Sequence, residues 1–295
     1  MKKEPQVAII IVNYNGFSDT AACVASLKKM DYSNYQIIVV DNASTAEPSP
    51  EEKEYLEKHT VYIQNPVNEG FSAGNNVGIR WAMENGADYV LLINGDTTVE
   101  PGFLTRLLEK ADQEPQAGIL CGRIMFYDNP ERIWYAGGTM DFVTGNVVQL
   151  GWGKTLQEFS GHSGPVTFAT GCLMLIPAEI IKQIGLLEES YFLYCEDTDY
   201  CCRVLAAGYS IYYCNDAVIY HKISQSVGAA SKTQQYYMTR NALHLIRTYG
   251  TDWKKGFLST MERDIKSICK GRLKPSIAVR AYYNAWKENM GKIEL

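Results

Sequence analysis

Two carboxylates closely follow buried apolar runs. Asp41 comes directly after 37–40, and Asp96 comes shortly after 89–93. If both runs are parallel strands, their carboxyl ends meet at the edge of the sheet where open α/β sheets bind ligands. Two acids there suit a hard cation and a ligand with hydrogen-bond donors, as in a nucleotide diphosphate with Mg²⁺ or Mn²⁺. We expect Asp96 to bind the metal and Asp41 a base or ribose, although a helix cap and an Asx-turn would also explain them.

A third group of acids opens a predicted helix. Glu196, Asp197 and Asp199 fall within four positions, directly after the aromatic run 191–194. Acids in a first helical turn often only complement the helix dipole, but three exceed what capping needs. Close like charges and partial burial raise a carboxyl pKa toward the range of a general base. We therefore expect catalysis from this group, with Arg203 pairing with Asp199.

His221 and Arg240 are further candidates. His221 ends the apolar run 218–220, and this position favours a role near the acids, although a lone histidine is more often structural. Arg240 lies on a helix predicted from Ser231 onward. Its guanidinium can bind a diphosphate through two parallel hydrogen bonds, and a salt bridge to the acidic body would explain it equally well.

The loop 68–78 carries glycine at every fourth position, at Gly70, Gly74 and Gly78. It matches neither the dinucleotide-binding glycine pattern nor a phosphate-binding loop with lysine, which excludes both of those classes. Close approach of the backbone to a ligand would require such glycines, and so would tight packing of a helix on a sheet.

The elements that must position these residues alternate along the first part of the chain. Strands are predicted at 7–12, 37–40, 61–64 and 89–93, with helices between them. This alternation predicts a doubly wound, mostly parallel sheet. From 118 to 166 short β-like pieces are broken by glycines, which predicts hairpins and a mobile flap. Further strands are predicted at 168–176, 210–214 and 218–220, and helices at 196–207 and from 231 to the end, with interruptions at Gly250, Gly271 and Pro275.

Composition sets outer limits on the function. The chain has 295 residues, 46% of them hydrophobic, and a net charge of −5, which argues against nucleic acid as a partner. Residues 251–295 carry ten Lys/Arg against five Asp/Glu, so the rest of the chain carries −10. This basic tail could touch anionic lipid at the inner face of the plasma membrane or a charged acceptor, or it could be a solvated helical face.

The chain shows no sign of a membrane span, a signal peptide or a disulfide framework. No apolar run approaches the ~18 residues of a membrane span, and the run 7–12 is too short for a signal-peptide core. The eight cysteines contain no Cys-x-x-Cys pair. We therefore expect reduced thiols and a cytoplasmic location.

Seven short motifs together carry a family resemblance. They are Val7–Asn15, Val39–Ser44, Asn68–Phe71, Asn94–Asp96, Thr170–Cys172, Glu196–Asp199 and Tyr236–Asn241. Through these motifs, in this order, the chain resembles the family 2 glycosyltransferases, and within them the bacterial rhamnosyltransferase-like group. The resemblance covers residues 7 to about 247.

The resemblance implies a GT-A fold with helices on both faces of the sheet and a helical C-terminal extension. Residues 1–117 would be the nucleotide-sugar-binding half, 118–230 the acceptor-binding and catalytic half, and 231–295 the extension. The implied activity is inverting transfer of a sugar to a hydroxyl of a glycan or polyprenyl-linked acceptor in cell-surface polysaccharide synthesis. The donor would be dTDP- or UDP-linked, with rhamnose from dTDP as the best guess, and the cofactor Mg²⁺ or Mn²⁺.

The resemblance also assigns site residues. Asp197 would be the catalytic base beside Glu196, and Asp96 and His221 would hold the metal. The nucleotide-binding residues would be Asn13, Tyr14, Asn15, Asp41, Asn68, Gly70, Asn75 and Arg240. Asn94 stands where the family has the first acid of Asp-x-Asp, which lowers the charge of the ligand set and raises the importance of His221.

Two other functions compete with this reading. A nucleotidyltransferase would need a basic, glycine-rich loop after the first strand, and residues 13–17 contain no Lys or Arg. A non-catalytic nucleotide-sugar-binding module would not need the pair Glu196-Asp197. The sequence leaves open whether the chain forms a homodimer.

Overall fold

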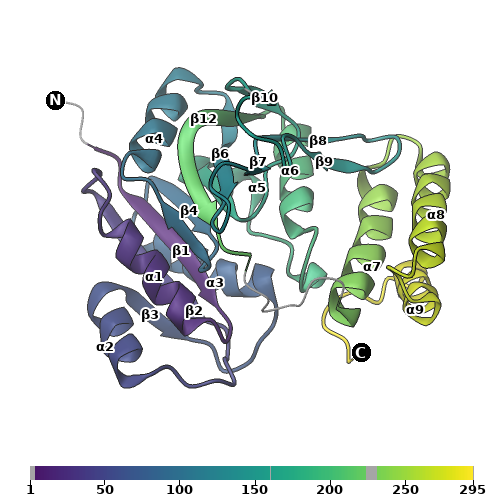
Figure 1. Ribbon diagram of the computed structural model, residues 1–295, viewed down its shortest axis with the longest axis horizontal. Helices are drawn as coiled ribbons and strands as arrows, with labels where there is room; N and C mark the ends of the chain where they lie inside the picture. Colours follow the sequence, from purple (N-terminus) through teal and green to yellow (C-terminus); the bar gives the residue numbers. More distant parts are fainter. Residues whose placement is uncertain (1–3, 160, 224–230, 295) are drawn as a thin grey trace.

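A single mixed sheet forms the centre of the protein. The computed structural model describes residues 4–159, 161–223 and 231–294. In the sheet the strands follow the order β10-β12-β6-β11-β4-β1-β2-β3. Helices cover both of its faces, and three further helices stand at one end of the molecule (Figure 1). The predicted boundary after residue 230 adjoins 224–230, which lie outside the described residues.

The first half follows the predicted alternation of strands and helices. Its parallel strands β1, β2, β3 and β4 comprise Val7–Asn13, Tyr35–Asp41, Val61–Gln64 and Tyr89–Ile93. The helices α1, α2 and α3 comprise Phe17–Leu27, Pro50–His59 and Phe71–Glu84. The β-branched residues of β1, β2 and β4 are almost wholly buried between the helix layers, as expected for parallel strands.

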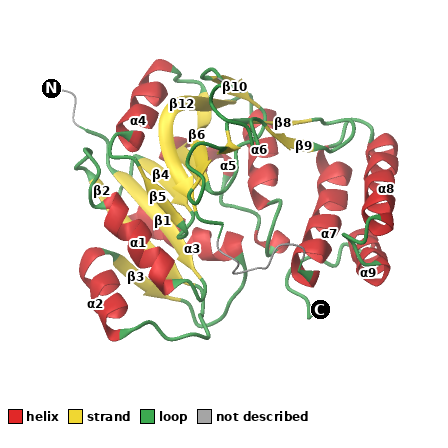
Figure 2. Ribbon diagram, in the orientation of Figure 1, coloured by secondary structure: helices red, strands yellow, loops and turns green. Residues whose placement is uncertain are grey.

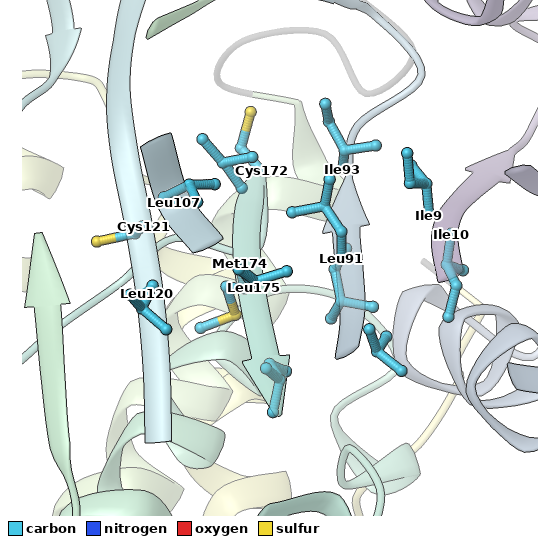
Figure 3. Close-up of a cluster of buried hydrophobic side chains, with 14 of the residues drawn as sticks. Ile9, Ile10, Leu91, Ile93, Leu107, Leu120, Cys121, Cys172, Met174 and Leu175 are labelled. Atoms are coloured by element: carbon cyan, nitrogen blue, oxygen red, sulfur yellow. The ribbon is translucent and has the colours of Figure 1, made fainter. Parts of the chain in front are cut away.

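The second half of the sheet is mixed. Its strands β5, β6, β7, β10, β11 and β12 comprise Thr97–Val99, Ala117–Phe126, Ile133–Tyr135, Gly164–Val166, Leu173–Pro177 and Ser210–His221. Strand β11 runs antiparallel to both β4 and β6, while β12 runs parallel to β6. The helices α4, α5 and α6 comprise Phe103–Gln113, Ala178–Ile184 and Glu196–Ala206, and the 3₁₀-helix η1 comprises Glu189–Tyr191. Side chains from β1, β4, β11 and β6 fill the core (Figure 3).

Three sequence predictions for this half are wrong. The region 118–166 begins with the ten-residue core strand β6, although the hairpin of β8 (Gly138–Met140) and β9 (Val147–Gln149) does form. The strands predicted at 210–214 and 218–220 are one strand, β12, with a register shift between Cys214 and Val218. The strand predicted from 168 starts only at Leu173.

The evenly spaced glycines of α3 serve helix packing. A Cβ atom on Gly74 would lie 2.9 Å from the Val12 side chain, and one on Gly78 would lie 2.6 Å from Ile10. Both contacts are to β1, so the spacing lets the helix lie close against the sheet. Of the two explanations open for this spacing, the structure supports packing at these two positions.

Three helices form the C-terminal extension, and their breaks fall at the predicted glycines and proline. They are α7 (Lys232–Tyr249), α8 (Trp253–Cys269) and α9 (Pro275–Trp286). Both α8 and α9 pack on α7, and a small apolar core that includes Tyr236 and Ile277 joins α7 to α9. Figure 2 shows this all-helical part beside the sheet. Among the described residues, no helix has the length and apolar character that a bilayer crossing requires.

Candidate active site at the ends of β4, β11 and β12

The ends of β1 and β2 are joined by a buried polar network. Asn13 and Asp41 are paired in register, and Asn13 Nδ2 donates to the Asp41 carboxylate over 2.9 Å. The same carboxylate accepts from Gln64 Nε2 at 2.7 Å. Asn15 has a left-handed backbone, with φ of 59°, and its side-chain oxygen accepts from two backbone amides of the 45–46 turn. Tyr14, between these residues, stays exposed.

The next segment predicted to bind the nucleotide, 68–71, contacts the backbone just before α6, the helix that carries the three acids. Asn68 Oδ1 accepts from the Gly70 amide, and Gly70 has φ of 100°. A Cβ on Gly70 would lie 2.1 Å from the carbonyl oxygen of Phe192, so glycine is needed here for contact with protein backbone. Asn75 is buried and donates to the Phe71 carbonyl within its own helix, away from any open surface.

Asp96 and His221 meet at the ends of two strands. Asp96 follows β4, His221 ends β12, and His221 Nε2 lies 3.1 Å from Asp96 Oδ1. The short strand β5 after Asp96 pairs with β12 and fixes this approach. Burial lowers the pKa of His221, but Cys172 and Asp96 raise it more, to about 10. The structure thus brings together the two residues predicted to hold a metal.

The donor set at this pair fits a divalent cation that shares its ligands with a diphosphate. A carboxylate oxygen and an imidazole nitrogen are ligands for Mn²⁺, and carboxylate suits Mg²⁺. His221 Nδ1 is buried without a hydrogen-bond partner among the described residues. The described chain has no group of three or more His, Cys, Asp or Glu side chains placed to hold a metal. Phosphate oxygens and water would therefore have to complete the coordination.

Glu196 and Asp197, the acid pair at the start of α6, have different environments. Asp197 Oδ2 accepts from the Gly171 amide at 3.0 Å, and Oδ1 accepts from the Thr198 amide at 2.7 Å. Glu196 is buried, and its Oε2 finds no partner in the described part of the chain. Burial and the charge of Asp197 raise the pKa of Glu196 to about 8. Burial also raises the pKa of Asp197, against the lowering effect of its hydrogen bonds. Because Asp197 accepts two backbone amides and Glu196 Oε2 accepts none in the described part of the chain, the negative charge is better stabilised on Asp197.

A strained backbone segment, 192–195, immediately precedes α6. Phe192, Tyr194 and Cys195 all have positive φ, at 62°, 67° and 72°. Positive φ is costly for residues other than glycine, and such strain persists only where the surroundings enforce it. The backbone before the acid pair is therefore held in place by its neighbours.

The segment 170–172 links the acid pair to the metal pair. The Gly171 amide binds Asp197, and the adjacent Cys172 carbonyl accepts from the Asn94 amide at 3.2 Å. Figure 3 shows Cys172 and Ile93 at the same end of β11 and β4. One short stretch of backbone therefore connects the partner of Asp197 to the strand end that leads to Asp96.

Arg240 lies elsewhere than predicted. Its side chain is 0% exposed, so the expectation that it faces a diphosphate is not supported. It donates to the carbonyl groups of Tyr191, at 3.0 Å, and Gly291, at 2.7 Å, and its guanidinium lies over the Tyr237 ring. The neighbouring Asn241 donates to three carbonyls between 191 and 194. The motif Tyr-Tyr-x-x-Arg-Asn thus clamps the strained segment against α7.

The ion pair predicted for the third acid of the helix is confirmed. Arg203 Nε lies 2.8 Å from Asp199 Oδ2. The other carboxylate oxygen of Asp199 accepts from the hydroxyl of Tyr249, on α7, at 2.7 Å. Asp199 therefore joins α6 to α7 as part of the same clamp.

Replacing Arg240 with methionine is expected to lower the free energy of unfolding by about 1–3 kcal/mol for each buried carbonyl left without a donor. The matched control is Arg247→Met on the same helix, because the Arg247–Glu288 pair is largely exposed and such pairs contribute little. Thermal unfolding of the two variants provides the measurement. Equal shifts in the two melting temperatures would contradict the clamp.

An aromatic cluster beside His221 was missed in the sequence. The Trp134 ring meets the His221 ring edge-on, with centroids 4.7 Å apart. The ring centroid of Trp152 lies 5.7 Å from that of Trp134 and 5.3 Å from that of Phe126, and the Trp152 side chain is 53% exposed. In the sequence Trp152 stands between two glycines and resembles a loop residue. The pairing of β6 with β7, and the backbone hydrogen bonds between Ile133 and residues 153–154, bring the rings together.

The comparison with known families matches this architecture. Residues 8–185 match the model of Glycosyl transferase family 2, which is more than half of the chain. The protein belongs to this family. It is accordingly a glycosyltransferase, as predicted from the motifs. The family match ends before the acid pair, so the assignment of Asp197 depends on the geometry described above.

Curated relatives include rhamnosyltransferases. The chain is 24% identical over 250 residues to the dTDP-rhamnosyl transferase RfbF of Shigella flexneri, covering 81% of this chain and 79% of the relative. It is also 24% identical over 240 residues to an N-acetylglucosaminyl-diphospho-decaprenol L-rhamnosyltransferase of Mycobacterium tuberculosis, covering 75% and 77%.

Solved structures confirm the expected GT-A fold. The structure of GalNAc-T7 with UDP, GalNAc and Mn²⁺ superposes with a TM-score of 0.67 at 16% identity, covering 86% of this chain and half of that chain. The mannosyltransferase PcManGT from Pyrobaculum calidifontis, in complex with GDP-Man and Mn²⁺, gives a TM-score of 0.59 at 14% identity, covering 97% and 81%.

Proposed function

We propose that this family 2 glycosyltransferase moves a sugar from a nucleoside diphosphate donor to a hydroxyl of a glycan or lipid-linked acceptor, with inversion at the anomeric carbon. The observation that carries the proposal is the link from Asp197 through 170–172 to the strand end that bears Asp96 and His221. With this connection, the base can act on the attacking hydroxyl and the metal pair on the leaving diphosphate of the same displacement reaction. The printed names of the relatives favour rhamnose from dTDP as the donor and cell-surface polysaccharide as the product.

In the proposed reaction Asp197 accepts the proton of the acceptor hydroxyl while that oxygen forms a bond to the anomeric carbon. The bond from that carbon to the diphosphate oxygen breaks on the opposite face, which inverts the configuration. Protonated Glu196 adds no second negative charge beside Asp197 at neutral pH. Asp96 and His221 would hold Mg²⁺ or Mn²⁺, which stabilises negative charge on the departing diphosphate.

The proposed donor half is residues 1–117. Asn13, Asn15 and Asp41 form a rigid edge beside the exposed ring of Tyr14, which is free to stack on a base. Asn68 and Gly70 place this edge against the segment before the acid pair. The proposed acceptor half, 118–230, supplies the aromatic cluster beside His221.

A panel of nucleotide sugars, each with and without Mn²⁺, tests the donor by thermal shift, because a ligand that binds only the folded protein raises its stability. The best donor is then incubated with a polyprenyl diphosphate-linked sugar acceptor, and the anomeric configuration of the product is determined by NMR. We expect stabilisation by a dTDP-sugar and an inverted product. Donor binding without transfer to any acceptor would favour the non-catalytic module, and a retained configuration would exclude the base role of Asp197.

The exposed face of Trp152 is proposed as the surface on which the acceptor sugar ring packs. Trp152→Ala is expected to raise the acceptor KM about tenfold, equivalent to ~1.4 kcal/mol of lost binding, with the donor KM unchanged. Trp286→Ala is the control, because Trp286 is also an exposed tryptophan but lies on α9. Steady-state kinetics with a water-soluble acceptor analogue measure both constants. A rise in the donor KM alone would assign Trp152 to the donor instead.

A further inference from the structure

The outer face of α9 leaves large apolar side chains uncovered. Val279, Tyr283 and Trp286 are 70%, 59% and 71% exposed, more than any other large apolar side chain in the described chain. Their spacing of four and then three residues puts them on one face of the helix. The opposite face, with Ile277 and Ala281, is buried against α7. The exposed stripe is therefore not needed to hold α9 in place.

Helix α8 combines apolar exposure with positive charge. Leu258 and Ile265, seven residues apart on one face, are both more than half exposed. Beside them lies a shallow hollow whose lining includes four basic side chains and a single acid. The lining residues are Asn146, Ser259, Glu262, Arg263, Lys266, Ser267, Lys270 and Arg272. Glu262 pairs with Lys266, which leaves the hollow with a positive excess.

We propose that α8 and α9 form a docking face for an anionic lipid bilayer. Tryptophan and tyrosine favour the boundary between headgroups and acyl chains, and lysine and arginine beside them favour anionic headgroups. The hydroxyl, amide and basic groups of the hollow suit a headgroup phosphate. This proposal concerns a surface outside the proposed active site and does not depend on the substrate.

Charge decides between a membrane and a second copy of the chain. Residues 251–295 carry a net charge of +5, whereas the remainder carries −10. A symmetric dimer through this face would bring +5 against +5, which opposes association. An anionic bilayer attracts the extension and repels the acidic body, so the charge distribution also orients the protein, with α8 and α9 toward the lipid.

Co-sedimentation of the full chain with vesicles tests the proposal. Vesicles of phosphatidylcholine alone are compared with vesicles containing 30% phosphatidylglycerol, at about 0.1 and 0.5 M NaCl. We expect at least tenfold stronger binding to the anionic vesicles, weakened by the higher salt. The double variant Lys266→Gln/Lys270→Gln is expected to lose about fivefold for each charge removed. Val279→Ser/Trp286→Ser is expected to lose at least tenfold.

Matched control variants lie outside α8 and α9. Lys53→Gln on α2 removes an exposed charge, and Val67→Ser removes an exposed apolar side chain, and neither should change binding. All of these positions are exposed, so the melting temperatures should stay unchanged and exclude misfolding as a cause. Equal binding to both kinds of vesicle, or equal losses in test and control variants, would overturn the proposal. A dimer in sedimentation velocity that Val279→Ser/Trp286→Ser dissociates would instead assign the face to a second copy.

Discussion

Replacing Asp197 with asparagine is expected to reduce sugar transfer by at least ~10²–10⁴-fold, the usual contribution of a general base. Donor affinity should stay within a few-fold of the wild type, because Asp197 makes its hydrogen bonds to Gly171 and Thr198 rather than to the proposed nucleotide edge. The base must be deprotonated to act, so the wild-type rate should fall as the pH falls through the pKa of Asp197. That pKa is raised by burial, so the fall should begin above the pH range of an ordinary aspartate. Single-turnover rates against pH and calorimetric donor binding are the measurements.

Glu196→Gln is the matched control for this prediction. Glutamine mimics the protonated acid that burial favours, so transfer at neutral pH should stay within about tenfold of the wild type. Between the ordinary pKa of 4.5 and about 8 the folded state keeps a proton that the unfolded state has lost, and stability therefore falls as pH rises. Glutamine removes this loss, so it should raise the melting temperature more at pH 8 than at pH 5. Two results would refute the assignment of Asp197 as the base. One is a transfer rate of Glu196→Gln as low as that of Asp197→Asn, and the other is a large loss of donor affinity in Asp197→Asn.

Replacing Asp96 with asparagine is expected to lower transfer by about 10²-fold or more and to weaken Mn²⁺ binding in the presence of a nucleoside diphosphate. The substitution removes the carboxylate of the Asp96–His221 pair while keeping the size of the side chain. In the described part of the chain no third His, Cys, Asp or Glu completes a metal group, so little remains to compensate. Titration of Mn²⁺ by calorimetry or electron paramagnetic resonance measures the affinity separately from turnover.

Asn94→Asp provides the opposite change at the same strand end. An added carboxylate two residues before Asp96 increases the charge of the ligand set, so Mn²⁺ should bind more tightly, by about tenfold. The Asn94 backbone, which donates to Cys172 and accepts from Thr97, is unaffected by the substitution. Weaker Mn²⁺ binding in Asn94→Asp, or unchanged Mn²⁺ binding in Asp96→Asn, would argue against a metal at this pair.

The first half of the sheet could be predicted because its signals are local. Continuous β-branched runs, each followed by a polar turn, predict parallel strands, and polar residues at their carboxyl ends then share one edge. Asp96 and His221 also fall at strand ends, so the sequence could bring them together. Their approach depends on β5, which is only three residues long and was not predicted.

Strand β6 could not be predicted because its glycines suggest a loop. A Cβ on Gly122 would lie 2.4 Å from the Ala217 carbonyl, and one on Gly118 would lie 2.7 Å from Val204. These glycines are required by β12 and α6, which approach β6 closely but lie far away in the sequence. The prediction that Arg240 faces a diphosphate lacks support for a similar reason. Its donors bind carbonyl groups that only the tertiary fold places around it.

The clamp between α7 and the 192–195 segment bears on how such enzymes could be recombined. The strained turn at 192–195 and the following helix α6 are held by side chains of α7. These side chains are Arg240, Asn241 and Tyr249, and together with the turn and α6 they form one structural unit. A chimaera joined between the turn at 192–195 and Arg240 would pair one parent's turn with another parent's anchor. Domain exchange between relatives should therefore transfer 186–294 as a single block, because a shorter graft would separate the proposed catalytic carboxylates from the side chains that hold them in position.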